Sequence, residues 1–208
     1  MINNCRLILI GGGTCSGKTT IAKAIGRRLG ELKTVIISHD NYYHDLSGMN
    51  AEESREYNFD HPSAIDTAYL VQDIRQMMAG HAVNVPDYDF ITHERSEGTL
   101  CVAYADVIIL EGIFALYYPE LLQLSDLRIF VDTDADLRLV RRLIRDTRDR
   151  GYDVEGVLDK YVLTVKPSHD AFIEPSKKNA DVIIPGEREF DKVLYMLHGY
   201  LHYEISRG

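Results

Sequence analysis

Eight residues near the N-terminus, Gly12-Gly-Thr-Cys-Ser-Gly-Lys-Thr19, match the pattern G-x4-G-K-[ST]. Glycines let backbone N–H groups turn toward phosphate oxygens, and a helix that begins near Lys18 adds a partial positive charge. The Lys18 ammonium can reach the β and γ phosphates, and the Thr19 hydroxyl can bind Mg²⁺. The alternative, a glycine-rich turn that matches by accident, occurs in on the order of one chain in a hundred. The predicted nucleotide-binding residues here are Gly12, Gly13, Thr14, Cys15, Ser16, Gly17, Lys18, Thr19 and Thr20.

Two carboxylates follow apolar runs that read as strands. Asp40 comes shortly after Val35–Ile37, and Glu111 comes directly after Val107–Leu110. Ligands of open parallel sheets bind beyond the carboxyl ends of the strands. We therefore expect Glu111 near the Mg²⁺ ion, and Asp40 near the γ-phosphate, where it can accept a proton from an attacking hydroxyl. The competing interpretations are a solvated Glu at a strand end and an Asp that caps a turn.

Six arginines lie within thirteen residues of one predicted helix, Asp134–Arg150. Arginine makes planar, bidentate contacts to phosphate, so residues 134–152 are predicted to form a lid over a transferring phosphoryl group. One alternative is a salt-bridged face in solvent, which we expect for the outer members Arg138 and Arg148. The other is an RNA-binding stripe, which the acidic chain disfavours. The six are Arg138, Arg141, Arg142, Arg145, Arg148 and Arg150.

Short apolar runs alternate with helical patterns along most of the chain. This alternation predicts an α/β fold in which helices cover both faces of a parallel sheet. A capping box at Ser63 and Asp66 is expected to begin a helix that stops at Gly80. The predicted strands are Leu7–Ile10, Val35–Ile37, Val107–Leu110, Leu127–Val131 and Asp181–Ile184. The other predicted helices are Lys18–Leu29, Asp134–Arg150, Asp153–Lys166 and one around Val193–Leu201.

Residues 81–104 interrupt this alternation of predicted strands and helices. Val83–Val85 and Thr99–Val102 are strand-like and flank the polar stretch Pro86–Gly98. They predict a small β-hairpin insertion that stands off the main sheet. Since internal repeats and long linkers are lacking, residues 1–208 are expected to form a single domain that carries this lobe.

Composition excludes several classes of protein. The 208 residues are 45% hydrophobic and carry a net charge of −9, which is ordinary for a folded chain and disfavours nucleic-acid polymers and anionic membranes as partners. Three cysteines without CxxC spacing indicate reduced thiols. No apolar run is long enough for a signal peptide or a membrane span. We therefore expect a cytoplasmic protein.

These features together resemble the uridine kinase (uridine–cytidine kinase) family of P-loop kinases. Matching blocks run in the family's order from Ile8 to about Pro185, which is far more specific than the phosphate loop alone. The blocks are Gly12–Thr20, His39-Asp40-Asn-Tyr-Tyr43, Tyr57-Asn-Phe-Asp-His-Pro62, Pro86-x-Tyr88-x-Phe90, Leu110-Glu-Gly-Ile113, Phe130-Val-Asp-Thr-Asp134, Arg141-Arg-x-x-Arg-Asp146 and Glu174-Pro-Ser-Lys-Lys-x-Ala-Asp-Val-Ile-Ile-Pro185.

The resemblance implies transfer of phosphate from ATP or GTP, with Mg²⁺, to the 5′-hydroxyl of uridine or cytidine. It implies that Asp40 is the acid/base residue and that relatives form homo-oligomers, commonly tetramers, partly through the β insertion. The implied catalytic set is Asp40, Lys18 and Arg145, with Arg150 on the nucleotide and Thr19 and Glu111 at the metal. The implied acceptor-binding residues are Asp60 and Arg142 for the ribose, and Phe59, Tyr88 and His93 around the pyrimidine.

Two pocket positions depart from the family pattern. Tyr152 stands where the family usually has Arg, and Lys160 stands where it usually has Gln; both are predicted to contact the acceptor. The Arg-Gly-Gly that often follows the last strand is replaced by Gly186-Glu187. One alternative is therefore a kinase of another small hydroxyl acceptor, either a different nucleoside or a sugar phosphate. Another is a nucleotide-binding regulator without turnover, which Asp40, Glu111 and the lid arginines disfavour. A GTPase is disfavoured because no Asn-Lys-x-Asp motif occurs.

Overall fold

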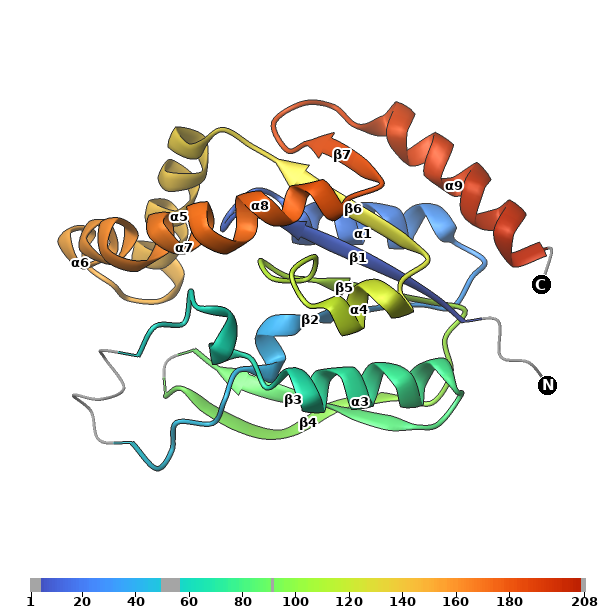
Figure 1. Ribbon diagram of the computed structural model, residues 1–208, viewed down its shortest axis with the longest axis horizontal. Coiled ribbons are helices and arrows are strands. Elements are labelled where there is room, and N and C mark those ends of the chain that lie inside the picture. Colours follow the sequence, from blue (N-terminus) through green and yellow to red (C-terminus); the bar gives the residue numbers. More distant parts are fainter. Residues whose placement is uncertain (1–4, 50–56, 91, 207–208) are drawn as a thin grey trace.

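Parallel strands in the order β2-β5-β1-β6-β7 form the central sheet of the computed structural model, which describes residues 5–49, 57–90 and 92–206 (Figure 1). In β1 and β5 nearly every residue is buried, because helices cover both faces of the sheet. The strands are β1 Arg6–Gly12, β2 Thr34–Ser38, β5 Val107–Glu111, β6 Leu127–Asp132 and β7 Val182–Pro185.

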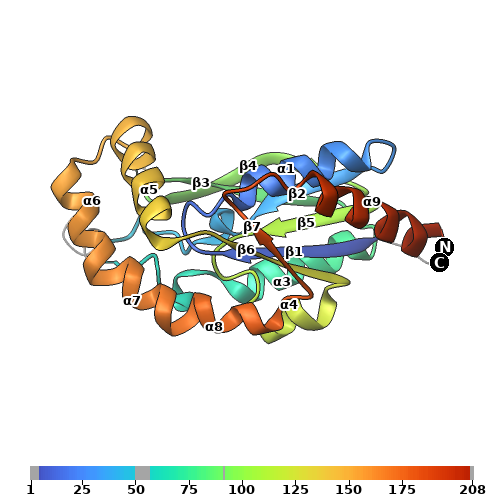
Figure 2. The same cartoon turned by 90° about the horizontal axis from the view of Figure 1, so that it is seen from above.

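Alternate residues of β1 face opposite hydrophobic cores. Leu7 and Leu9 belong to the core that includes residues of α3 and α4, whereas Ile8 and Ile10 belong to the core beneath α1 and α9. Figure 2 shows these two helix pairs on opposite sides of the sheet. The predicted α/β fold, with helices on both faces, is confirmed. The helices are α1 Lys18–Leu29, α3 Thr67–Met78, α4 Pro119–Leu124 and α9 Asp191–Ser206. None of the described helices has the length and apolarity of a membrane span.

The predicted β-hairpin insertion is also confirmed, but its strands are longer than expected. β3 Val83–Asp89 pairs antiparallel with β4 Glu94–Val102 as a sheet of its own. The polar stretch Pro86–Gly98 is thus largely strand, because β3 exposes Asn84, Asp87 and Asp89 while its other residues are buried. The register shifts between Val85 and Asp87, at Pro86, whose missing N–H suits a bulge. Position 91 lies outside the described residues.

The N-terminus of α3 differs from the predicted capping box. Asp66 is the N-cap, and its carboxylate accepts a hydrogen bond from the Tyr69 N–H at 3.2 Å. Ser63 lies instead in a separate 3-10 turn, Pro62–Ala64, which His61 caps. The predicted box is wrong because Pro62 begins this turn of its own before the helix starts.

A long helical run after α5 Ala135–Asp149 differs most from expectation. The predicted helix 153–166 is wrong in extent. The regular α-helix α6 Val154–Lys160 ends before residue 166, but short π-helical, α-helical and 3-10 turns continue the helical run to Asn179. Pro167 and Pro175 do not end the run, because each follows a π-helical turn and stands at the start of a new α-helical turn. Figure 2 shows α6, α7 and α8 end to end. The successive turns are Tyr161–Val165, α7 Lys166–Ser168, His169–Ile173, α8 Glu174–Ser176 and Lys177–Asn179.

Arg138 of α5 ties this helical run to the phosphate loop. Its Nε donates to the Thr133 carbonyl oxygen at 3.0 Å, and its Nη2 lies 3.2 Å from Nε2 of His169. The guanidinium also lies against Gly13, where a Cβ atom would come within 2.6 Å of Nη1. The expectation that Arg138 is a solvent-exposed outer residue is wrong, since it is buried, whereas Arg148 is exposed as expected.

This contact predicts a stability change in mild acid. Burial, and next the charge of Arg138, lowers the pKa of His169 to about 4. The unfolded chain takes up this proton at a pH of about 6.5, so between these values the unfolded state binds more protons and stability falls as pH falls. From pH 7 to 5 the wild type should lose up to about 2 kcal/mol through this group. His169→Gln keeps a hydrogen-bond acceptor and should remove that part of the loss.

Urea unfolding at pH 7 and pH 5 measures the difference. His81→Gln, at an exposed position, is the matched control and should leave the pH dependence unchanged. An equal acid-induced loss in wild type and His169→Gln would show that His169 does not titrate in this way.

Candidate active site

The phosphate loop connects β1 to α1 through a turn that glycine makes feasible. Gly12 and Gly17 have φ values of +142° and +102°, and a Cβ at Gly12 would lie 2.5 Å from the Val131 carbonyl oxygen. The Lys18 Nζ donates to the Gly13 carbonyl oxygen at 2.9 Å across the loop. Burial lowers the pKa of Lys18, while the nearby Glu111 and Asp40 charges act to raise it.

Thr19 and Glu111 meet beside this loop. Glu111 ends β5 opposite Ile10 of β1, and the Thr19 hydroxyl donates to its Oε1 at 2.8 Å. A hydroxyl and a carboxylate oxygen this close, next to a phosphate loop, fit the oxygen preference of Mg²⁺, which usually takes few protein ligands and completes its shell with phosphate and water. The described residues contain no cluster of three or more His, Cys, Asp or Glu that could hold a metal alone.

Asp40 lies in the short 3-10 helix His39–Tyr42 that follows β2. Burial alone would raise the pKa of its carboxyl. The hydrogen bond from His39, together with the positive charges of Lys18 and Arg150, holds that pKa below its usual value. The Asp40 carboxyl is therefore ionised at neutral pH and able to accept a proton.

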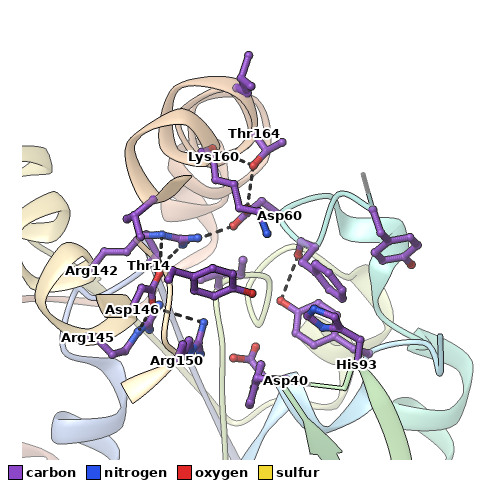
Figure 3. Close-up of a pocket in the computed structure, with 18 residues that line it drawn as sticks. Thr14, Asp40, Asp60, His93, Arg142, Arg145, Asp146, Arg150, Lys160 and Thr164 are labelled. Atoms are coloured by element: carbon purple, nitrogen blue, oxygen red, sulfur yellow. Dashed lines mark hydrogen bonds and ion pairs between the residues drawn. The ribbon is translucent and has the colours of Figure 1, made fainter. Parts of the chain in front are cut away.

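Two cavities open on either side of Asp40. The first, of about 450 Å³, lies along the phosphate loop and reaches Lys18, Thr19 and Glu111. The second, of about 390 Å³, is walled by aromatic and charged side chains (Figure 3). The residues that line both cavities are Thr14, Asp40, Ile113 and Arg145. A group bound in one cavity can therefore meet a group bound in the other at Asp40.

The wall of the second cavity carries a charged pair and an aromatic pair. Asp60 lies 3.9 Å from Nη1 of Arg142 and accepts a hydrogen bond from the Thr164 hydroxyl at 3.1 Å. Burial raises the pKa of Asp60, and the charge of Arg142 opposes that effect. Phe59 and His93 stack with ring centroids 4.6 Å apart. The cavity thus offers polar groups on one side and a flat apolar face on another (Figure 3).

Asp146, a buried residue of α5, organises the arginines. Its carboxylate lies 3.2 Å from Nε of Arg142, 2.8 Å from Nε of Arg145 and 3.6 Å from Nη1 of Arg150. Arg150 also lies over the Phe90 ring at 4.6 Å. One buried carboxylate thus directs three cations toward the cavities, which the count of arginines alone could not show.

A family model described as Phosphoribulokinase / Uridine kinase family matches residues 7–191. The chain belongs to this family. It is 47% identical to the uridine kinase of Staphylococcus haemolyticus over 182 residues, which are 88% of each chain. It is 46% identical to the uridine kinase of Clostridium perfringens over 182 residues, covering 86% of this chain and 88% of that one.

Solved structures of more distant kinases share the fold. The phosphoribulokinase from Rhodobacter spheroides superposes with a TM-score of 0.66 at 18% identity, covering 89% of this chain and 74% of that one. The D-glycerate 3-kinase from Cryptococcus neoformans gives 0.65 at 16% identity, covering 88% and 87%. At these identities the likeness concerns the fold alone.

Most residues singled out by the resemblance to the uridine kinase family lie at the two cavities. Tyr88 is the exception: it does not line either cavity but is buried behind the second one, against Tyr43 and Phe90. Tyr152 and Lys160 line the second cavity as a pair, with the Lys160 Nζ 4.9 Å from the Tyr152 ring centroid.

Several lining residues were not anticipated from the sequence. Tyr43, Tyr57, Leu163 and Thr164 all face the second cavity. Thr164 follows Lys160 by four residues, so the predicted helix 153–166 already placed it on the same face as Lys160. The loop cavity likewise includes Gly186, whose carbonyl oxygen accepts from Arg141 at 3.4 Å.

Loss of the Lys18 charge should abolish turnover without unfolding the chain. Phosphoryl transfer depends on positioning and electrostatics, so Lys18→Ala should raise the barrier by about 3 kcal/mol or more, at least about a hundredfold in kcat. Lys23→Ala, an exposed position on the same helix, is the control. Nucleotide-dependent turnover near the wild-type rate in Lys18→Ala would contradict the assignment of the phosphate loop.

Proposed function

We propose that this chain transfers the γ-phosphoryl group of ATP to the 5′-hydroxyl of uridine or cytidine. The observation that carries the proposal is the pair of cavities that meet at Asp40, one on a phosphate loop and one with an aromatic and charged wall. Relatives 46–47% identical that are named uridine kinase support the choice of acceptor.

In this mechanism the loop amides and Lys18 hold the β and γ phosphates. Arg145 and Arg150, directed by Asp146, face the region where negative charge develops. The 5′-hydroxyl passes its proton to the Asp40 carboxylate as its oxygen bonds to the γ-phosphorus. The bond from that phosphorus to the β–γ bridging oxygen breaks, and the nucleoside diphosphate leaves. Mg²⁺ bound near Thr19 and Glu111 would offset the charge of the phosphates.

The acceptor lies in the second cavity. Asp60 and Arg142 are placed to hold ribose hydroxyls, since one accepts and the other donates hydrogen bonds. The stacked rings of Phe59 and His93 offer a surface for a planar base. Tyr88 supports this wall from behind.

We place the reaction in the cytoplasm and expect a homo-oligomer, a tetramer by family resemblance. Light scattering of the purified chain would test the oligomeric state.

An ADP-release assay over a panel of acceptors tests the function. Uridine and cytidine should be the best substrates among nucleosides and sugar phosphates, with ATP and GTP compared as donors. A sugar phosphate or a purine nucleoside as the best substrate would replace the acceptor and leave a kinase. Nucleotide binding without turnover on any acceptor would favour a regulatory role.

Replacement of the proposed base should affect the chemical step most. Asp40→Asn keeps the shape of the side chain but removes the proton acceptor, so kcat should fall by about 10²–10⁴-fold. The KM for ATP should stay within about threefold, because the phosphate loop is unchanged. Asp45→Asn, at an exposed position five residues later, is the control. Equal losses in ATP affinity and in kcat would instead indicate a structural turn residue.

Tyr152 and Lys160 should behave as a coupled pair. Tyr152→Arg removes the ring from beneath the Lys160 ammonium and places a cation near Lys160, Arg142 and Arg150, so the KM for uridine should rise by about tenfold. Adding Lys160→Gln relieves that repulsion and should return KM to within about threefold of the wild type. Steady-state kinetics of the four proteins at saturating ATP gives the coupling. Additive effects of the two substitutions would contradict it.

A further inference from the structure

His39 is a wholly buried imidazole that neither cavity reaches, next to the carboxylate on which the proposed function depends. Its Nδ1 lies 2.9 Å from Oδ1 of Asp40. On the other side of the ring, the Phe114 backbone N–H donates to Nε2 at 3.0 Å. The buried ring thus lies between the Asp40 carboxylate and a backbone amide.

The two contacts determine where the imidazole proton lies. Because Nε2 accepts a hydrogen bond from the Phe114 amide, it carries no proton. The proton of the neutral ring is therefore on Nδ1, the nitrogen that lies 2.9 Å from Oδ1 of Asp40. A backbone amide cannot reverse its role, so the direction of this hydrogen bond is set by the main chain.

Packing prevents the ring from turning away. The His39 ring stacks on Phe114 at an interplanar angle of 9° and meets the edge of Tyr43 at 89°. Gly112 leaves room for it: a Cβ there would lie 1.8 Å from Cδ2 of His39. The ring is held in one orientation by neighbours on three sides.

We propose that His39 is a positioning residue for the phosphoryl transfer: its Nδ1–H holds Oδ1 of Asp40, so that Oδ2 is turned toward the acceptor hydroxyl. This inference rests on the proposed function of Asp40. The other charged and titratable groups that face Asp40 are Lys18, Arg145, Arg150, Tyr43 and Asp60. His39 is set apart from them by a ring nitrogen that lies 2.9 Å from the Asp40 carboxylate and by its contribution to the lowered pKa of that carboxyl.

Two substitutions separate the two contacts of the ring. His39→Gln can keep an acceptor near the Nε2 position for the Phe114 amide but loses the donor to Asp40. His39→Asn can keep a donor near the Nδ1 position but leaves the Phe114 amide without its acceptor. The positioning role predicts that His39→Gln lowers kcat by about tenfold or more, part of the general-base contribution, with KM values for ATP and uridine within about threefold. His39→Asn should keep kcat within about threefold of the wild type, even where it melts at a lower temperature.

A wild-type kcat in folded His39→Gln would overturn the proposal. So would a loss of kcat that follows melting temperature through both variants, since that is the behaviour of a purely structural residue. A measurement on the unmodified chain covers the case in which a variant does not fold. Nitrogen-15 NMR of the histidine side chains should find the His39 proton on Nδ1, and a proton on Nε2 would exclude the proposed contact.

The tests also separate this inference from the function on which it rests. A wild-type chain inactive on every nucleoside would remove the proposed function, and with it the role of His39 in catalysis. An active wild type with an unaffected His39→Gln would remove only the positioning role.

Discussion

The register of parallel strands is the constraint on which the rest of this molecule depends. β5 lies between β1 and β2, and Glu111 is opposite both Ile10 and Ser38. Because the carboxyl ends of parallel strands meet at one edge, the phosphate loop after β1 and the turn after β2 emerge beside each other. A two-residue slip in β2 would move Asp40 by more than 6 Å along the edge, roughly twice a hydrogen-bond distance. Backbone pairing thus sets the distances between the groups that could carry out the chemistry.

Charge compensation is the second requirement, because burying ions without partners is costly. Asp146 accepts a hydrogen bond from Arg145, forms an ion pair with Arg142 and lies close to Arg150, so these cations face the cavities while one carboxylate balances them. Asp40 and Asp60 differ in their surroundings: the pKa of Asp40 is held low by His39 and nearby cations, whereas burial raises that of Asp60. The Asp40 carboxyl is therefore ionised at neutral pH, which the proposed proton transfer requires.

Local signals in the sequence were enough to predict the phosphate loop, the parallel sheet and the position of Glu111 at the end of a strand, since each depends on neighbouring residues or on an apolar run. Contacts between segments that are distant in the chain could not be predicted from the sequence. Arg138 is buried with its Nε donating to Thr133 and its Nη2 beside His169, and His169 lies 31 residues away. Tyr88 occupies a position that the family resemblance assigns to the pyrimidine pocket, but it packs behind the cavity wall. The run 161–179 stays helical through two prolines because a π-helical turn precedes each of them. The spacing of apolar residues in the sequence does not predict such turns.

The proposed meeting of acceptor and phosphate at Asp40 is most directly tested by a crystal structure of this chain with uridine, ADP and Mg²⁺, a complex that cannot react forward. The 5′-oxygen of uridine should lie about 2.6–3.2 Å from a carboxylate oxygen of Asp40. The pyrimidine should lie in the aromatic cavity, and the ADP phosphates in the loop. Uridine bound outside that cavity, or with its 5′-oxygen directed away from Asp40, would contradict the proposed reaction geometry.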